Sequence, residues 1–242
     1  MTPPLDESGR ASLRNAGSPL ATATLSKLGI TLQPADILRS LGYPPQAAPP
    51  PDIIRATEKL MLEAKAYLHP SGTYSLYAPT NWTDHSVDIG GGTIRGNIGE
   101  FSRGANRIAV FIVTVGNGIT RQIGIRREDG DAFAALVLDT IGSWAAEYTA
   151  QALITHLAKH LGPDESFTQR FSPGFCGMQL SQQRVLFRLA PAAAIGVALL
   201  PSLFMHPMKS VSGFIGLGPR ALVGDHLSPC EPCPLVDCHL RQ

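Results

Sequence analysis

The residues best suited to chemistry lie in segment 170–177, which reads RFSPGFCG. Proline fixes one φ angle and the glycine after it has no Cβ, so this backbone can turn sharply and approach a ligand closely. Arg170, just upstream, can bind a carboxylate through two hydrogen bonds. The segment indicates either a carboxylate-binding turn or an ordinary surface turn beside an arginine.

Cysteines form a second candidate site. Cys230 and Cys233 have the spacing of metal-chelating thiolates, Cys238 follows, and Cys176 lies within the turn segment. If the three tail cysteines fold back onto Cys176, they form a four-thiolate site beside the turn. Four thiolates are compatible with a [4Fe–4S] cluster or zinc, and the alternative is free or redox-active thiols.

Weaker signals have simpler alternatives. His156 and His160 are one helical turn apart and could bind a metal, but no third ligand accompanies them, which favours a polar helix face. The glycine run in 88–93 resembles a phosphate-binding loop. No Gly-Lys-Ser/Thr follows it, so a flexible turn is the alternative.

The elements that must position these residues include one central strand and one long helix. The continuous β-branched run at 108–115 predicts a strand in the middle of a sheet. Asp131 begins a helical pattern whose apolar stripe continues to Leu157. Gly142 and Ser143 are small, which lets another element pack closely there. Glu147 lies just off the stripe.

Further elements are predicted from periodicity and from proline and glycine positions. The predicted helices are 34–41, 52–68 and 181–189, and Asp52 is expected to cap the second of them. The predicted strands are 74–77, 195–200, 203–205 and 210–217. We expect residues 1–22 to be a mobile tail, 23–220 to be one domain and 221–242 to be a cysteine-rich metal-binding tail.

Composition excludes several function classes. A 242-residue chain with 44% hydrophobic residues can bury a substantial core. A net charge of +1 gives no electrostatic basis for binding nucleic acid or an anionic membrane. Segment 189–205 is apolar, but Pro191 and Pro201 interrupt it and it falls short of the roughly 20 residues of a spanning helix. Asp6 and Glu7 oppose a signal peptide, so we expect a cytoplasmic protein.

Five segments in order resemble a known family. They are ILRSLGY at 37–43, VFIVTVG at 110–116, GSWAAE at 142–147, the Arg-x-x-Pro-Gly-aromatic turn and SVSG at 210–213. This order resembles the S-adenosylmethionine-binding activation domain of cobalamin-dependent methionine synthase, and more closely its small stand-alone relatives in corrinoid methyltransferase systems. The resemblance implies an α+β fold, with a twisted, mainly antiparallel sheet flanked by helices.

The resemblance also implies a ligand site. Arg170 matches the carboxylate-binding arginine of the family, and Ser172 and Gly174 match positions whose backbone contacts S-adenosylmethionine. Phe175 replaces the usual tyrosine and lacks its hydroxyl. The resemblance places an acceptor for the ligand's amino group near Glu147, for which a solvated glutamate is the alternative.

The implied function is reductive reactivation of a corrinoid protein or cobalamin-dependent methyltransferase, such as methionine synthase. Cobalamin is expected on the partner, because the chain has no Asp-x-His-x-x-Gly segment. An iron–sulfur cluster or an external donor would supply the electron that cob(II)alamin needs. The alternatives are a non-catalytic docking module with structural zinc and a metal-dependent redox protein unrelated to methyl transfer.

Overall fold

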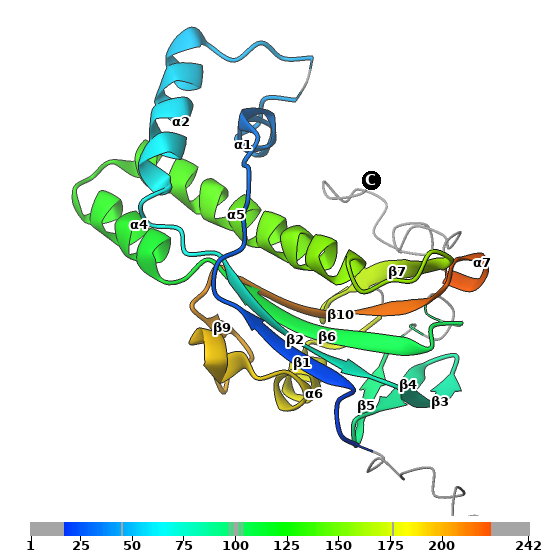
Figure 1. Ribbon diagram of the computed structural model, residues 1–242. Helices are drawn as coiled ribbons and strands as arrows, with labels where there is room; N and C mark the ends of the chain where they lie inside the picture. Colours follow the sequence, from blue (N-terminus) through cyan, green and yellow to red (C-terminus); the bar gives the residue numbers. More distant parts are fainter. Residues whose placement is uncertain are drawn as a thin grey trace, which may run out of the picture.

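A five-stranded sheet forms the centre of the molecule (Figure 1). The computed structural model describes residues 17–44, 46–96, 98, 102, 104–175 and 177–223. The strands lie in the order β1 (Ala21–Leu25), β2 (Ser71–Tyr77), β6 (Arg107–Thr114), β10 (Ser210–Pro219) and β7 (Glu165–Phe171). Each pairing between these strands is antiparallel. The predicted central strand is confirmed as β6, whose β-branched residues are buried on both faces.

One long helix, α5 (Ala132–Ala158), crosses one face of this sheet (Figure 1). Asp131 caps it as predicted, because its Oδ1 accepts a hydrogen bond from the Ala134 amide at 3.0 Å. The second half of the apolar stripe packs on the inner residues of β2, β6 and β10, Phe111 and Ile215 among them. The helix is therefore fixed over the middle of the sheet.

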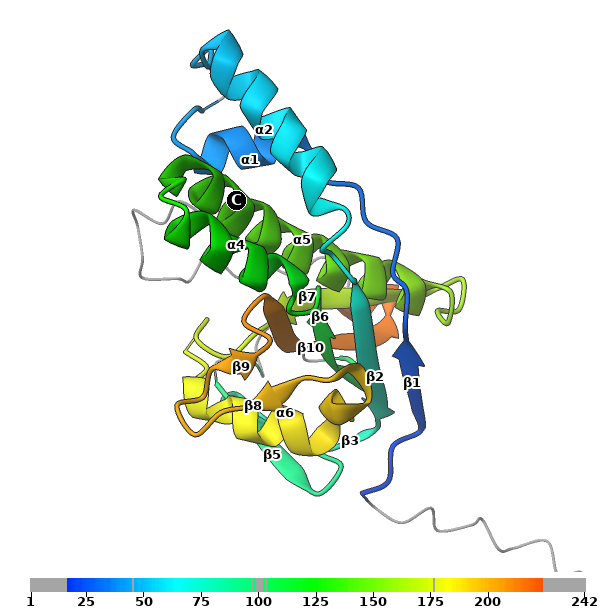
Figure 2. The same ribbon diagram turned by 90° about the vertical axis from the view of Figure 1, so that its left-hand side faces the viewer.

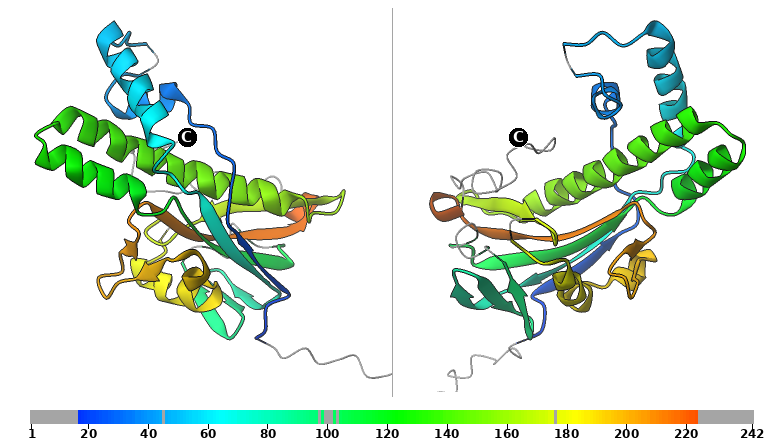
Figure 3. Two further views of the ribbon diagram at one scale, coloured as in Figure 1. Left: turned by 60° about the vertical axis from the view of Figure 1, so that its left-hand side comes forward. Right: turned by 180° about the vertical axis from the view of Figure 1, so that it is seen from behind.

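Three further helices pack around the first half of α5: α1 and α2 lie on its side away from the sheet, and α4 runs alongside it (Figures 2 and 3). They are α1 (Pro34–Ser40), α2 (Pro51–Ala64) and α4 (Gly118–Glu128). The prediction that Asp52 caps α2 is wrong. Proline suits the first helical position, so α2 begins at Pro51 and Asp52 lies in its first turn. The helix also ends before Leu68, in a turn where the Tyr67 amide bonds to the Ala64 carbonyl.

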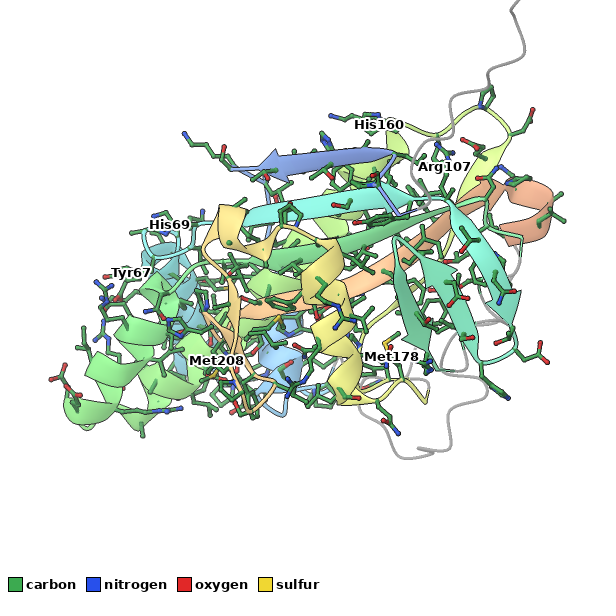
Figure 4. All side chains as sticks on the ribbon, turned by 90° about the horizontal axis from the view of Figure 1, so that it is seen from below. Tyr67, His69, Arg107, His160, Met178 and Met208 are labelled. Atoms are coloured by element: carbon green, nitrogen blue, oxygen red, sulfur yellow. The ribbon has the colours of Figure 1, made fainter. Side chains whose placement is uncertain are left out.

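The opposite face of the sheet is covered by a short helix and a small second sheet (Figure 4). The helix is α6 (Gln183–Leu189), preceded by the 3-10 turn η1 (Leu180–Gln182), and the sheet comprises β3 (Pro79–Thr83), β4 (Ser86–Ile89) and β5 (Gly92–Arg95). The glycine run forms the two-residue turn between β4 and β5. Gly90 and Gly91 both have positive φ there, as tight hairpins require.

The strands predicted at 195–200 and 203–205 are much shorter. Only β8 (Ala198–Leu199) and β9 (Met205–His206) pair, after the 3-10 turn η2 (Ala192–Ile195). Gly196 ends that turn in the left-handed conformation, with φ of +68°, which breaks the extended run. The described chain closes with α7 (Arg220–Val223). No helix in the described ranges is long and apolar enough to cross a membrane.

Candidate functional site

A polar face of α5 is contacted by cations from two other segments. Asp139, Ser143 and Glu147 follow one another at four-residue steps, which places them on one side of the helix. Arg170 from β7 and Lys209, just before β10, form ion pairs with this face. Figure 3, seen from behind, shows β7 and β10 beside α5. Three segments that are distant in sequence therefore meet at one helix face.

The structure brings two predicted ligand residues, Glu147 and Arg170, into direct contact. The Arg170 Nη2 atom donates to Glu147 Oε2 at 2.6 Å. Arg170 lies opposite Ile215 of β10, so its side chain leaves the sheet on the side that α5 covers. The two side chains are 30% and 46% exposed, so solvent screens their attraction and the pair can exchange partners.

The predicted Pro-Gly turn follows β7 directly. The Phe175 amide bonds to the Ser172 carbonyl at 3.1 Å, and the Gly174 amide bonds to the Met178 carbonyl at 2.8 Å. Gly174 has φ of +98°, which only glycine adopts without strain. No described atom lies within 4 Å of the place where a Cβ on Gly174 would be, so that side of the turn is open. The Phe175 side chain is 57% exposed.

Ser172 has a buried hydroxyl that forms no hydrogen bond among the described residues. Buried polar atoms are usually paired, so such an atom is a candidate for a ligand contact. The hydroxyl lies against Gly213 of β10. A Cβ on Gly213 would lie 3.0 Å from Ser172 Oγ and 2.5 Å from the Phe171 carbonyl oxygen. Gly213 therefore permits the close approach of the 170–177 segment to the 208–213 segment.

Three site residues were not predicted from the sequence: Lys209, Asp139 and Ser143. Lys209 Nζ lies 2.9 Å from both Ser143 Oγ and Asp139 Oδ1. Its carbon chain covers Gly142, which was predicted to let another element approach. The four-residue spacing of polar residues on α5 was the available signal. Nothing local in the sequence connected that spacing with a lysine more than 60 residues away.

On a neighbouring face, α5 holds α1. The Tyr148 hydroxyl donates to Asp36 Oδ2 at 2.5 Å, and Trp144 Nε1 donates to Ser40 Oγ at 2.9 Å. The hydrogen bond to Asp36 is the main reason that the pKa of Tyr148 is raised to about 12, and burial adds to it. These contacts fix α1 beside the turn of α5 that carries Glu147.

The histidine pair lies near the end of α5. The rings of His156 and His160 meet edge-on with centroids 5.7 Å apart, and the ring of Tyr74 lies 6.3 Å from that of His156. Burial lowers the pKa of His156, and the charge of Lys159 lowers it further. Within the described ranges, no group of three or more His, Cys, Asp or Glu side chains could hold a metal ion. His156, in the last turn of α5, and His160, just past its end, are thus neighbours.

All four cysteines of the predicted metal site, Cys176, Cys230, Cys233 and Cys238, lie outside the described residues. The described neighbours of Cys176 are Phe175 and Gly177, in the turn that follows β7. The predicted four-thiolate site therefore stays a prediction.

A pocket of about 310 Å³ borders the turn segment at Gly177. It is lined by His85, Arg95, Gly96, Gly177, Gln179 and Gln182. None of the predicted ligand residues is among them. The α5 face, by contrast, combines opposite charges, a hydroxyl with no hydrogen-bond partner among the described residues, and a close backbone approach.

Comparison with known proteins agrees with the architecture. The profile of the family described as "Vitamin B12 dependent methionine synthase, activation domain" matches residues 98–222, which is slightly more than half of the chain. A solved structure, "Crystal Structure of the MetH Reactivation Domain bound to AdoHcy", superposes with a TM-score of 0.55 and 15% sequence identity, covering 88% of this chain and 82% of that one. No curated protein sequence matches.

The matched range contains the second half of the sheet, α5 and the Arg-x-x-Pro-Gly turn. The structural similarity extends beyond it and confirms the predicted α+β fold with antiparallel sheets and helices. On these findings, the chain belongs to the family of the vitamin B12-dependent methionine synthase activation domain.

Proposed function

We propose that this protein binds S-adenosylmethionine on the α5 face and assists the reductive reactivation of a cobalamin-dependent methyltransferase. The observation that carries the proposal is the contact between Glu147 and Arg170. A carboxylate from one element and a guanidinium from another meet at a half-exposed position. Such a pair complements a zwitterion, and S-adenosylmethionine ends in a carboxylate and an ammonium group. Family membership supports the same assignment.

In this proposal the ligand replaces one ion pair with two. Arg170 binds the ligand carboxylate, for which the planar guanidinium can offer two parallel hydrogen bonds. Glu147 accepts from the ligand ammonium. The two side chains now satisfy each other at 2.6 Å, so the ligand must separate them. Separation costs little, because half-exposed pairs contribute about 0–1 kcal/mol to stability.

The turn after β7 supplies the remaining contacts. Ser172 offers a buried hydroxyl that a ligand oxygen or nitrogen would pair. Gly174 leaves open space on its Cβ side for close approach of the ligand. Phe175 adds an exposed aromatic surface without the hydroxyl of a tyrosine.

The chemistry is positioning of a methyl donor. In reactivation, the cobalamin of the partner would accept one electron from a cluster or an external donor. It would then take the methyl group, forming a cobalt–carbon bond as the carbon–sulfur bond breaks and S-adenosylhomocysteine leaves. The residues of this chain hold the amino-acid end of the ligand and keep the sulfonium accessible to the partner. Fixed orientation of two reactants is a large part of the rate gain in such a step.

We further propose that Cys176, Cys230, Cys233 and Cys238 hold a [4Fe–4S] cluster, with structural zinc as the alternative. A cluster would supply the single low-potential electron; with zinc, an external donor is needed and the chain acts as a docking module. Iron, sulfide and zinc analysis of anaerobically purified protein distinguishes these two outcomes. Replacement of Cys176 by Ala should lower the metal content. Unchanged content would exclude Cys176 as a ligand.

Anaerobic calorimetry tests the proposed function. The wild-type protein is titrated with S-adenosylmethionine and, separately, with a cobalamin-loaded methyltransferase. Binding of both, followed by methylation of the reduced partner when the three are combined, is the expected result. If neither S-adenosylmethionine nor the loaded partner binds, the proposed function is wrong.

A further inference from the structure

Lys209 is the one charged side chain among the described residues that is buried. Its side chain is 9% exposed, and removing an ammonium from water is costly unless it is paired and hydrogen-bonded. Both conditions are met, because Nζ lies 2.9 Å from Ser143 Oγ and 2.9 Å from Asp139 Oδ1. Ser143 is a proper acceptor here, since its own hydroxyl donates to the Asp139 carbonyl at 3.0 Å.

Lys209 connects α5 to the sheet at one point. Its carbonyl accepts from the Val115 amide at 3.1 Å, just past the end of β6. Its carbon chain lies over Gly142, where a Cβ would come within 3.1 Å of two of its carbons. The next residue, Ser210, begins β10. Lys209 therefore adds a directional polar contact to the apolar packing that holds α5 over β6 and β10.

That connection lies one helical turn from Glu147. Ser143 and Glu147 are four residues apart on the same face of α5, which is about 6 Å along the helix. Arg170 belongs to β7, which pairs with β10. The separation of Glu147 and Arg170 thus depends on how α5 lies over β10, and Lys209 contributes the polar contact to that relation nearest to Glu147.

Stability alone does not require this charge. An apolar side chain of similar length would also cover Gly142, and replacing a buried ion pair with packed apolar groups is often neutral or stabilising. The ammonium also constrains the orientation of α5, because it must lie within hydrogen-bond distance of two acceptors on adjacent turns of one helix face.

We propose that Lys209 is a positioning residue of the ligand site: by holding Ser143 and Asp139, it aims Glu147 at the ammonium group of the ligand. The inference rests on the proposed function, because it assigns the amino-acid end of S-adenosylmethionine to Glu147 and Arg170. Lys209 acts through α5 and needs no contact with the ligand.

The test compares two ligands that differ in the amino-acid end. S-adenosylmethionine has it, and 5′-methylthioadenosine lacks both it and the positive charge on sulfur, while keeping adenine, ribose and the sulfur atom. We expect Lys209→Met to weaken S-adenosylmethionine binding about tenfold, as a misplaced charge contact would. Binding of 5′-methylthioadenosine should stay within about twofold of wild type. Lys209→Arg should retain most of the affinity, and Lys65→Met, an exposed lysine on the loop after α2, is the matched control.

Several outcomes would overturn the inference. Equal weakening of both ligands would mean that Lys209 only maintains the fold, and unchanged S-adenosylmethionine binding would mean that it has no role. If Lys209→Met does not fold, the same two affinities are measured on Asp139→Asn. The affinity for S-adenosylmethionine should then fall about threefold, and that for 5′-methylthioadenosine should stay unchanged. If the wild type binds neither ligand, the proposed function fails first and this inference with it.

Discussion

Two ion pairs on one face of α5 differ in their exposure to solvent. The Lys209 side chain is 9% exposed and contacts both Asp139 and Ser143, whereas Arg170 and Glu147 are 30% and 46% exposed and contact each other. A buried ammonium must stay paired, while a screened surface pair can exchange its partners at little cost. One helix therefore combines a fixed contact with an exchangeable one, a single turn apart.

The largest expected effect comes from removing the exchangeable cation. Arg170→Ala should weaken S-adenosylmethionine binding at least about 100-fold, because the ligand carboxylate loses a charge-assisted, two-pronged partner. The free energy of unfolding should change by less than about 0.5 kcal/mol, since a half-exposed pair contributes little to it. Calorimetry and urea unfolding measure the two quantities. Arg170→Lys, which keeps the charge without the planar fork, should recover part of the affinity.

A smaller effect is expected where the strands approach closely. Gly213→Ala places a Cβ 2.5 Å from the Phe171 carbonyl oxygen, and the backbone of β7 must move. We expect the unfolding free energy to fall by about 2 kcal/mol, within the usual range for overpacking. Gly124→Ala in α4, where a Cβ would meet no atom within 4 Å, is the matched control. Equal stability of the two variants would contradict the close approach of β7 and β10.

The carboxylates of the two pairs should differ in their effect on stability. Asp139→Asn leaves the Lys209 ammonium with a weaker partner and should lower the unfolding free energy by about 1 kcal/mol. Glu147→Gln should lower it by less than about 0.5 kcal/mol. Urea denaturation of both variants, measured side by side at one ionic strength, makes the comparison. A larger loss for Glu147→Gln would reverse the assignment of fixed and exchangeable contacts.

The smallest effect is expected from removal of the Ser172 hydroxyl, which tests whether this group serves ligand binding or folding. Ser172→Ala removes a buried hydroxyl that has no partner among the described residues. The free energy of unfolding should therefore stay the same or rise by roughly 0.3 kcal/mol. If the hydroxyl pairs with the ligand, S-adenosylmethionine affinity should fall about threefold. Thermal unfolding and calorimetry give the two values. Loss of stability would instead reveal a hydrogen bond within the protein.

Local signals in the sequence were enough to predict much of the fold. The β-branched run at 108–115 indicated the central strand, and Asp131 with its apolar stripe indicated α5, because these patterns report burial on their own element. The strands predicted at 195–200 and 203–205 are present only as the short hairpin β8–β9. Their residues are as apolar as a strand, but Gly196 and Leu203 have left-handed backbone conformations, which interrupt the extended run.

Prediction of the site was limited by long-range contacts. Arg170 and Glu147 were identified through the resemblance, and the structure adds that they contact each other. Lys209 was not identified, since its partners lie on α5 and a lysine in a loop usually indicates a solvated residue. The pairing of a buried charge depends on tertiary packing, which no sequence window contains.

The length of α5 has a mechanical consequence. Its 27 residues span about 40 Å, and its first half is gripped by α1, α2 and α4 while Glu147 lies past the middle. Over the roughly 22 Å from the helix start to Glu147, a tilt of about 3° displaces the carboxylate by about 1 Å. Such a shift is enough to break a 2.6 Å hydrogen bond. The position of the Glu147 carboxylate therefore depends on the tilt of α5, and a movement of α1, α2 or α4 that tilts the helix would break its contact with Arg170.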